Sequence, residues 1–196
     1  MDNAMNTGNN EFESVLRPQA NWKELWFYQK SVVLSHLTNV FVRRFMPSHG
    51  SRTVDQMVQA ARSCKQNIVE GSADGVASVE MEIKLLNTAR GSIQELREDY
   101  EDYLGFKGLC QWGAGHPRYD AMLEYCRAHN KLEDYSSFFE KWNDEELANV
   151  AITLSRMVDK MMTSYSEKVE KEFLAEGGIR ERMSRARINY RNKEKR

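Results

Sequence analysis

One segment of the chain decides its fold, and it reads NDEELANVAITLSRMVDKMMTSYSEKVEKEFLAEGG over residues 143–178. Asn143 and Glu146 have the spacing of a capping box, in which each side chain bonds to the other residue's backbone N–H where a helix begins. A Gly-Gly pair closes the segment, and glycine is the residue at which helices most often end. Between these signals an apolar residue recurs every three or four positions, at Leu147, Val150, Leu154, Met157, Met161, Tyr165, Val169 and Phe173. This pattern predicts a helix over residues 144–175 with one face in a packed core.

Three segments upstream have the same character. Residues 22–46 contain neither Pro nor Gly, and Asn21 with Glu24 repeats the capping-box spacing at their start. Residues 53–70 and 78–104 each follow a short turn that contains glycine, and each has apolar residues at helical spacing. The chain is therefore expected to hold four long helices.

Four long helices with two short connections out of three predict an all-α fold, an antiparallel up-and-down four-helix bundle with crossing angles of roughly 20°. We expect the bundle to occupy residues 21–176. Residues 105–142 are rich in glycine and predict an irregular excursion with short helices between the third and fourth helix. Residues 1–20 are expected to be a mobile lead-in that carries little, and residues 177–196 a basic C-terminal arm.

Composition limits the class of protein. The chain has 196 residues, 41% of them hydrophobic, and only 3 Pro, which excludes a disordered or strand-and-turn-rich chain. It has 3 Cys, no N-terminal leader pattern and no long uncharged apolar run, so we expect a cytoplasmic protein with no structural disulfide and no membrane span.

Charge is divided unequally along the chain. The net charge is -1, but residues 179–196 hold eight basic and two acidic residues, a net charge of +6, so the remainder carries -7. Any contact with nucleic-acid phosphates is therefore expected to be confined to the C-terminal arm.

The first predicted helix has more apolar residues than one buried stripe requires. Trp26, Phe27, Leu34 and Phe41 would be partly bare in a monomer, and monomers rarely expose large apolar patches. These four residues are therefore the candidate interface of a homo-oligomer.

The third predicted helix is interrupted by Gly91, close to Ala89. A glycine inside a helix costs about 1 kcal/mol relative to alanine, so its presence predicts a reason in packing. We expect Ala89 and Gly91 to mark a close helix crossing.

Polar residues on the second and third helices form a further candidate set: Ser63, Asn67, Glu70, Ser92 and Glu95. If they face one another, they must satisfy one another's hydrogen bonds, which predicts a structural polar network. The alternative is an enzyme in which Glu70 and Glu95 act as a general acid–base pair, although no nucleophile, histidine base or phosphate loop accompanies them.

The candidate zinc ligands, Cys110, His116, Cys126 and His129, all lie in the excursion. Their spacing is not that of a usual zinc knuckle. We therefore predict no metal and no cofactor, and no small-molecule substrate is evident.

The arm has the pattern of a basic amphipathic helix. Ile179, Met183, Ala186 and Tyr190 recur at helical spacing, and arginines occupy the other faces. Such a segment can remain a solvated arm, contact nucleic acid, dock in the groove of another protein, or lie on anionic lipid, although we expect no membrane partner. The candidate binding residues are Arg180, Arg182, Arg185, Arg187 and Arg191.

Two motifs resemble a known family. In the second helix the matching residues are Gln56, Ala60, Ala61, Ser63, Asn67, Ile68, Glu70 and Gly71, and in the third they are Leu86, Ala89, Gly91, Ser92, Glu95 and Leu96. The register resembles that of the four-helix-bundle proteins encoded within bacterial 23S rRNA intervening sequences, and of the related accessory variability determinant of diversity-generating retroelements. The resemblance covers residues 22–104 and includes the fourth helix only by pattern. The excursion and residues 173–182 are similar to a C-terminal suffix found in a subset of these proteins.

The resemblance implies a homo-oligomer, a pentamer in known members, with no established enzyme activity. It also implies contact with nucleic acid or a reverse transcriptase, as in the retroelement member. This chain departs from the family at Val58 and Gln59, where paired arginines are usual, and in its acidic body. The leading hypothesis is a non-enzymatic, homo-oligomeric interaction protein whose basic arm engages RNA, DNA or a nucleic-acid enzyme. The alternatives are a scaffold that binds only protein, and an enzyme that uses the Glu70 and Glu95 pair or a metal in the excursion.

Overall fold

The structure, a computed structural model, describes residues 14–46 and 52–194, and every regular element in these two ranges is a helix. The elements are η1 (Trp22–Glu24), α1 (Trp26–Phe45), α2 (Arg52–Asp74), α3 (Val79–Lys107), α4 (Tyr119–Ala128), α5 (Leu132–Ser136), α6 (Asp144–Glu176) and α7 (Ile179–Glu194). None of these helices combines the length and the apolar character that crossing a bilayer requires. The first part of the predicted lead-in, residues 1–13, lies outside the described ranges.

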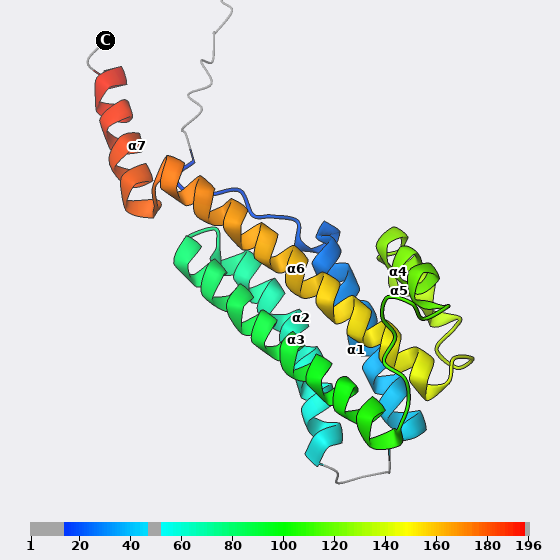
Figure 1. Cartoon of the computed structure of the whole chain (residues 1–196). Helices are drawn as coiled ribbons and strands as arrows, with labels where there is room; N and C mark the ends of the chain where they lie inside the picture. The colour runs from blue at the N-terminus through cyan, green and yellow to red at the C-terminus, as the bar shows by residue number, and fades with distance from the viewer. Residues whose placement is uncertain (1–13, 47–51, 195–196) are drawn as a thin grey trace, which may run out of the picture.

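Four long helices pack side by side along most of their length (Figure 1). α2 packs on α3, α3 on α6, α6 on α1, and α1 on α2, which closes a ring of contacts around one core. The short helices α4 and α5 lie outside this ring, α4 against α6 and α5 against α1. α7 extends beyond the end of α6, away from the other helices (Figure 1).

The start of α6 is fixed by the capping box that the sequence contains. The Asn143 side chain accepts from the Glu146 backbone N–H at 2.9 Å, and the Glu146 carboxylate accepts from the Asn143 N–H at 2.9 Å. The Asn21 spacing does not act in this way. The Asn21 amide donates to the Glu24 carboxylate at 2.7 Å, residues 22–24 form a separate 3-10 turn, and α1 begins only at Trp26.

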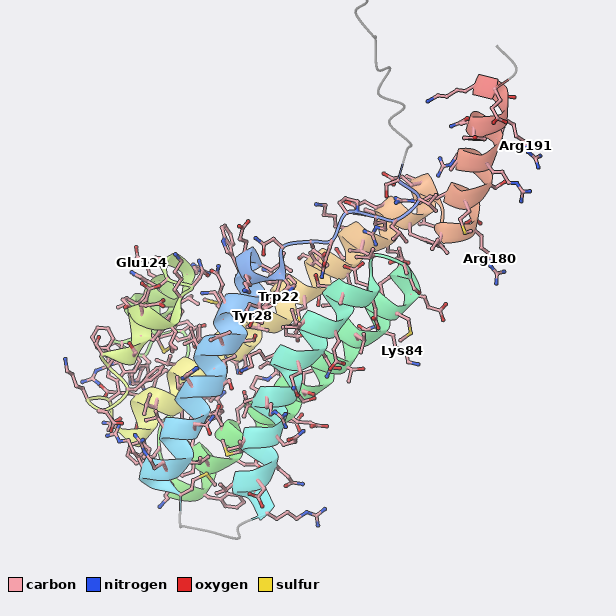
Figure 2. All side chains as sticks on the ribbon, turned by 180° about the vertical axis from the view of Figure 1, so that it is seen from behind. Trp22, Tyr28, Lys84, Glu124, Arg180 and Arg191 are labelled. Carbon is pink, nitrogen blue, oxygen red and sulfur yellow. The ribbon has the colours of Figure 1, made fainter. Side chains whose placement is uncertain are left out.

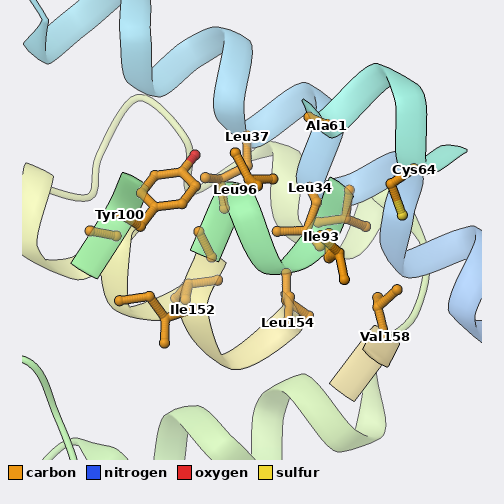
Figure 3. Close-up of a cluster of buried hydrophobic side chains, with 14 of the residues drawn as sticks. Leu34, Leu37, Ala61, Cys64, Ile93, Leu96, Tyr100, Ile152, Leu154 and Val158 are labelled. Carbon is orange, nitrogen blue, oxygen red and sulfur yellow. The ribbon is translucent and has the colours of Figure 1, made fainter. Parts of the chain in front are cut away.

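The core is filled by side chains from all four long helices. Figure 3 shows the cluster that they form, with Leu34, Leu37, Ala61, Cys64, Ile93, Leu96, Tyr100, Ile152, Leu154 and Val158 among its members. The one polar tip among them is satisfied, because the Tyr100 hydroxyl donates to Thr38 Oγ1 at 3.0 Å. The four long helices therefore share one core, in which the buried Tyr100 hydroxyl has a hydrogen-bond partner.

The middle of α6 is buried on every side. All nine residues of 147–155 are buried, although a surface helix normally buries only one stripe. α1 and α3 cover one side, and the excursion covers the other. The Asn149 side chain bonds α6 to the excursion, since it accepts from the Trp112 backbone N–H at 2.7 Å and donates to the Cys110 carbonyl at 2.9 Å. The excursion is therefore a structural cover for α6.

Gly91 does not mark a close helix crossing, in contrast to the sequence prediction. A Cβ built at Gly91 would meet nothing within 4 Å, whereas Ala89 is fully buried. Two residues turn about 200° around a helix, so Ala89 and Gly91 cannot share a face. The crowded glycine is Gly75 in the turn after α2, where a Cβ would lie 2.5 Å from Glu82 Oε2 and 3.0 Å from the Gly71 carbonyl oxygen.

The predicted oligomer interface on α1 also needs correction. Phe27 is 4% exposed, and Leu34 and Phe41 are 0% exposed, within a single chain. The second apolar face of α1 is covered by α5 as well as by the neighbouring long helices, which the sequence pattern did not anticipate. Of the four candidate residues only Trp26, at 64% exposed, is available to another molecule.

The described part of the lead-in is held in place, and it carries more than predicted. Arg17 donates to Glu82 Oε2 at 2.9 Å and forms an ion pair with Glu172 at 3.3 Å, and its backbone N–H bonds to the Val76 carbonyl at 3.2 Å. The Glu82 side chain is only 5% exposed, and its other oxygen accepts from the Tyr165 hydroxyl at 2.9 Å. Because a buried carboxylate is costly without partners, Arg17 stabilises the junction of α3 and α6.

We predict opposite effects of alanine at two glycines. Gly91→Ala should raise the free energy of unfolding by about 0.5 to 1 kcal/mol, because the methyl group enters open space and the helix propensity improves. Gly75→Ala should lower the free energy of unfolding by about 1 to 3 kcal/mol, because the methyl group would overlap the hydrogen-bonded Glu82 carboxylate and the Gly71 backbone. Urea denaturation of both variants measures the difference, and a destabilised Gly91→Ala would show that the face of α3 has been misassigned.

We predict that Asn149→Ala loosens the excursion. It leaves the Trp112 N–H and the Cys110 carbonyl without their partner, which should cost about 2 to 4 kcal/mol and raise hydrogen exchange over residues 110–112. Asn67→Ala is the matched control, because the Asn67 amide bonds only within its own helix, to Ser63. Equal losses in the two variants would contradict the assigned role of Asn149.

Candidate functional site

The strongest candidate site is α7 itself. This helix holds six basic and two acidic residues, and none of its residues is buried. Figure 2 shows its side chains spreading into solvent at the end of the molecule. A helix without a buried residue gains little stability from tertiary packing, so its basic side chains are available to a partner.

A corner made of specific contacts joins α7 to α6. α6 ends where the Gly177 N–H bonds to the Phe173 carbonyl at 2.8 Å, and Gly177 has a φ of 77°, a backbone region that side chains disfavour. On the far side of the corner the Glu181 carboxylate accepts from the Gly178 N–H at 3.0 Å, at the positive end of α7.

Two of the candidate arginines belong to this corner. Arg182 forms an ion pair with the Glu176 carboxylate, and Arg185 donates to the Glu176 backbone carbonyl. That carbonyl is in the last turn of α6, where no further helical N–H reaches it. Arg180, Arg187 and Arg191 are exposed and form no hydrogen bond or ion pair with any described residue.

The predicted apolar row of the arm is only partly sheltered. Met183 is 56% exposed and Tyr190 is 47% exposed, while Ile179 and Ala186 are half-buried. Ile188, on another face, is 53% exposed. The arm therefore offers apolar side chains as well as charge to a partner.

The predicted polar network is smaller in the structure than in the sequence. Asn67 Nδ2 donates to the Ser63 carbonyl at 2.9 Å and to Ser63 Oγ at 3.1 Å, and Ser92 Oγ donates to Ser63 Oγ at 3.1 Å. This cluster of three bridges α2 and α3. Glu70 and Glu95 are exposed and take no part in it.

The Glu70 and Glu95 side chains are both exposed, on α2 and α3. Neither forms a hydrogen bond or ion pair with a described residue. Glu95 instead belongs to a row of acidic side chains on α3. Burial raises the pKa of Asp99 in that row, and the charges of Asp102, Glu95 and Glu98 raise it further. The body is thus negative along α3, and this row repels phosphate.

The four candidate zinc ligands are dispersed. His116 stacks on Trp112 with ring centroids 4.6 Å apart, and His129 stacks on Tyr125 at 4.0 Å. Cys126 is buried, which raises the pKa of its thiol to about 11, whereas Cys110 is exposed. In the described ranges no group of three or more His, Cys, Asp or Glu side chains is arranged so that it could hold a metal ion.

Sequence reasoning missed a buried lysine. Lys30 is fully buried, and its ammonium donates to the carbonyls of Cys126 and His129, the latter at 2.6 Å, at the C-terminal end of α4. Burial lowers the pKa of Lys30, and the nearby Cys126 and Asp134 oppose that effect. The sequence did indicate that this position is buried, because Lys30 continues the helical spacing of Phe27 and Leu34 on the core-facing side of α1.

A cavity of about 190 Å³ lies where the excursion meets α6. Its lining is mostly apolar and consists of Trp112, Arg118, Met122, Tyr125, Cys126, Trp142, Glu146 and Val150. Arg118 and Glu146 pair with each other there, so neither charge is left over for a ligand.

Comparison of the chain with protein-family models, with curated proteins and with solved structures found no match. The interpretation of α7 therefore depends on its own charge, exposure and contacts.

We predict that the double variant Glu70→Gln and Glu95→Gln changes the free energy of unfolding by no more than about 0.5 kcal/mol, as is usual for exposed residues. Ser63→Ala is the matched comparison and should cost about 1 kcal/mol, because it removes the hydroxyl shared by Asn67 and Ser92. Thermal denaturation measures both. A large loss in the double variant would show that the two carboxylates have partners that matter.

Proposed function

We propose that this chain is a non-enzymatic, homo-oligomeric interaction protein whose α7 contacts the phosphates of nucleic acid. The single observation that carries the proposal is α7, a basic helix without a buried residue that is held away from an acidic body by a defined corner. We further propose that the four long helices form an antiparallel up-and-down bundle and that the protein works in the cytoplasm.

Electrostatics support the assignment to α7. A cationic segment that neutralises phosphates releases counterions, and this release supplies most of the sequence-independent affinity for nucleic acid. The remainder of the chain carries -7, and its acidic row on α3 is unfavourable for phosphate. Contact is therefore confined to the end of the molecule where α7 lies.

Family membership is part of the proposal. The second and third helices hold the residues that resemble the 23S rRNA intervening-sequence proteins, and Asn67 and Ser92 from those motifs both bond to the Ser63 hydroxyl. The resemblance favours a pentamer. Because three of the four predicted interface residues are buried, assembly must use other exposed apolar residues, and Trp26 and Phe106 are candidates at 64% and 89% exposed.

A second candidate is a scaffold that binds only protein. It is favoured by the exposed Met183, Ile188 and Tyr190, since apolar side chains on a basic helix suit the groove of a partner protein. In that case affinity would depend on these apolar residues and would vary little with salt.

We predict that truncation after Gly178 abolishes binding to RNA and DNA while the oligomer and the remaining helices stay intact, because no residue of α7 is buried. Gel-shift assays at low and moderate salt test binding, and light scattering with circular dichroism tests the rest. Binding by the truncated protein as tight as that of the full chain would refute the proposal. Loss of the oligomer on truncation would instead assign α7 to assembly.

A further inference from the structure

The five candidate arginines of α7 fall into two sets. Arg182 and Arg185 are engaged at the corner, through the carboxylate and the backbone carbonyl of Glu176. Arg180, Arg187 and Arg191 have no hydrogen-bond or ion-pair partner in the described part of the chain. A sequence pattern alone treats all five as equivalent.

The two sets also lie on opposite sides of the helix. At 3.6 residues per turn Arg180, Arg187 and Arg191 fall within about 40° of one another around the axis, at intervals of about 10 Å and 6 Å along it. Arg182 and Arg185 lie about 140° to 160° away from Arg180 on the same count. Figure 2 shows Arg180 and Arg191 projecting from the same side of α7.

The corner contacts join the first two turns of α7 to the end of α6. Arg182 and Arg185 reach back to the last residue of α6, and Glu181 accepts from the Gly178 N–H on the other side of the turn at 3.0 Å. Gly177 allows the turn itself, since a Cβ there would lie 3.0 Å from the Glu181 Cβ and its φ is positive. These contacts fix the direction in which α7 leaves α6.

We infer that Arg180, Arg187 and Arg191 are the residues that contact nucleic-acid phosphates, and that Arg182 and Arg185 are positioning residues that aim this row away from the acidic body. The inference rests on the proposed function and assigns different roles to the two sets of arginines in that site. The row is an interaction surface for the phosphates of one nucleic-acid backbone, because its three guanidinium groups are unneutralised and aligned. Arg182 is instead paired with the Glu176 carboxylate, and Arg185 is held at the corner by its hydrogen bond to the Glu176 carbonyl.

The test compares two full-length variants. The row variant carries Arg180→Gln, Arg187→Gln and Arg191→Gln, and the corner variant carries Arg182→Gln and Arg185→Gln. Glutamine keeps the helix propensity close to that of arginine, so both variants should retain α7. Fluorescence anisotropy with a labelled RNA single strand and a labelled DNA duplex, over about 50 to 200 mM salt, gives the dependence of log K on log salt.

For duplex DNA, the slope of log K against log salt should be smaller in magnitude by about 2.7 in the row variant, because three phosphate contacts are lost. Between about 50 and 200 mM salt the affinity of the wild-type protein should therefore fall about 40-fold more than the affinity of the row variant. The corner variant should keep the wild-type slope. Spin labels at Lys168→Cys on α6 and Ser184→Cys on α7, in a Cys110→Ser background, report the angle of the corner. The distance distribution should broaden in the corner variant and stay unchanged in the row variant.

Each other outcome overturns a defined statement. A corner variant whose slope falls by about two would show that Arg182 and Arg185 contact phosphate, which refutes the inference and leaves the proposed function standing. A row variant that keeps the wild-type slope, or a corner variant with an unbroadened distance distribution, also refutes the inference. Absence of binding by the wild-type chain refutes the proposed function and the inference together.

Discussion

Complete burial of the middle of α6 is the constraint on which the rest of the structure depends. Residues 147–155 have no exposed face, so three long helices cannot cover them alone. The excursion supplies the missing wall, and Asn149 bonds that wall to α6 through Trp112 and Cys110. The same wall covers the second face of α1, and its α4 end is held by the ammonium of Lys30. An irregular segment thus completes a regular core.

The long helices could be predicted from sequence because their signals are local. The capping box at Asn143 fixes the start of α6, and the three- and four-residue spacing of apolar side chains indicates the buried faces. The sequence prediction for Gly91 is wrong because a glycine within a helix does not show whether it faces a neighbouring helix or solvent. The prediction that Phe27, Leu34 and Phe41 lie at an oligomer interface is wrong for a related reason, since sequence shows that a second face is apolar but not which element covers it.

The positive charge of the candidate site could be predicted from sequence, but the arrangement of its side chains could not. The excess of arginine in residues 179–196 is visible in the sequence, and α7 is its location. The separation of those arginines into engaged and unengaged sets depends on the corner at Gly177, which is a tertiary feature. Lys30 shows the converse case, because its spacing on α1 marks it as inward-facing although lysine is rarely fully buried.

The three free cysteines have a consequence for how opening of this molecule can be followed. Cys110 is exposed, whereas burial raises the thiol pKa of Cys126 to about 11 and that of Cys64 to about 12. Only the thiolate is alkylated, so a maleimide reacts with Cys110 in the native protein and reaches the others only as their surroundings open. Cys126 reports detachment of the excursion, and Cys64 reports disruption of the core among α2, α3 and α6. The chain therefore contains its own ordered set of chemical reporters for partial unfolding.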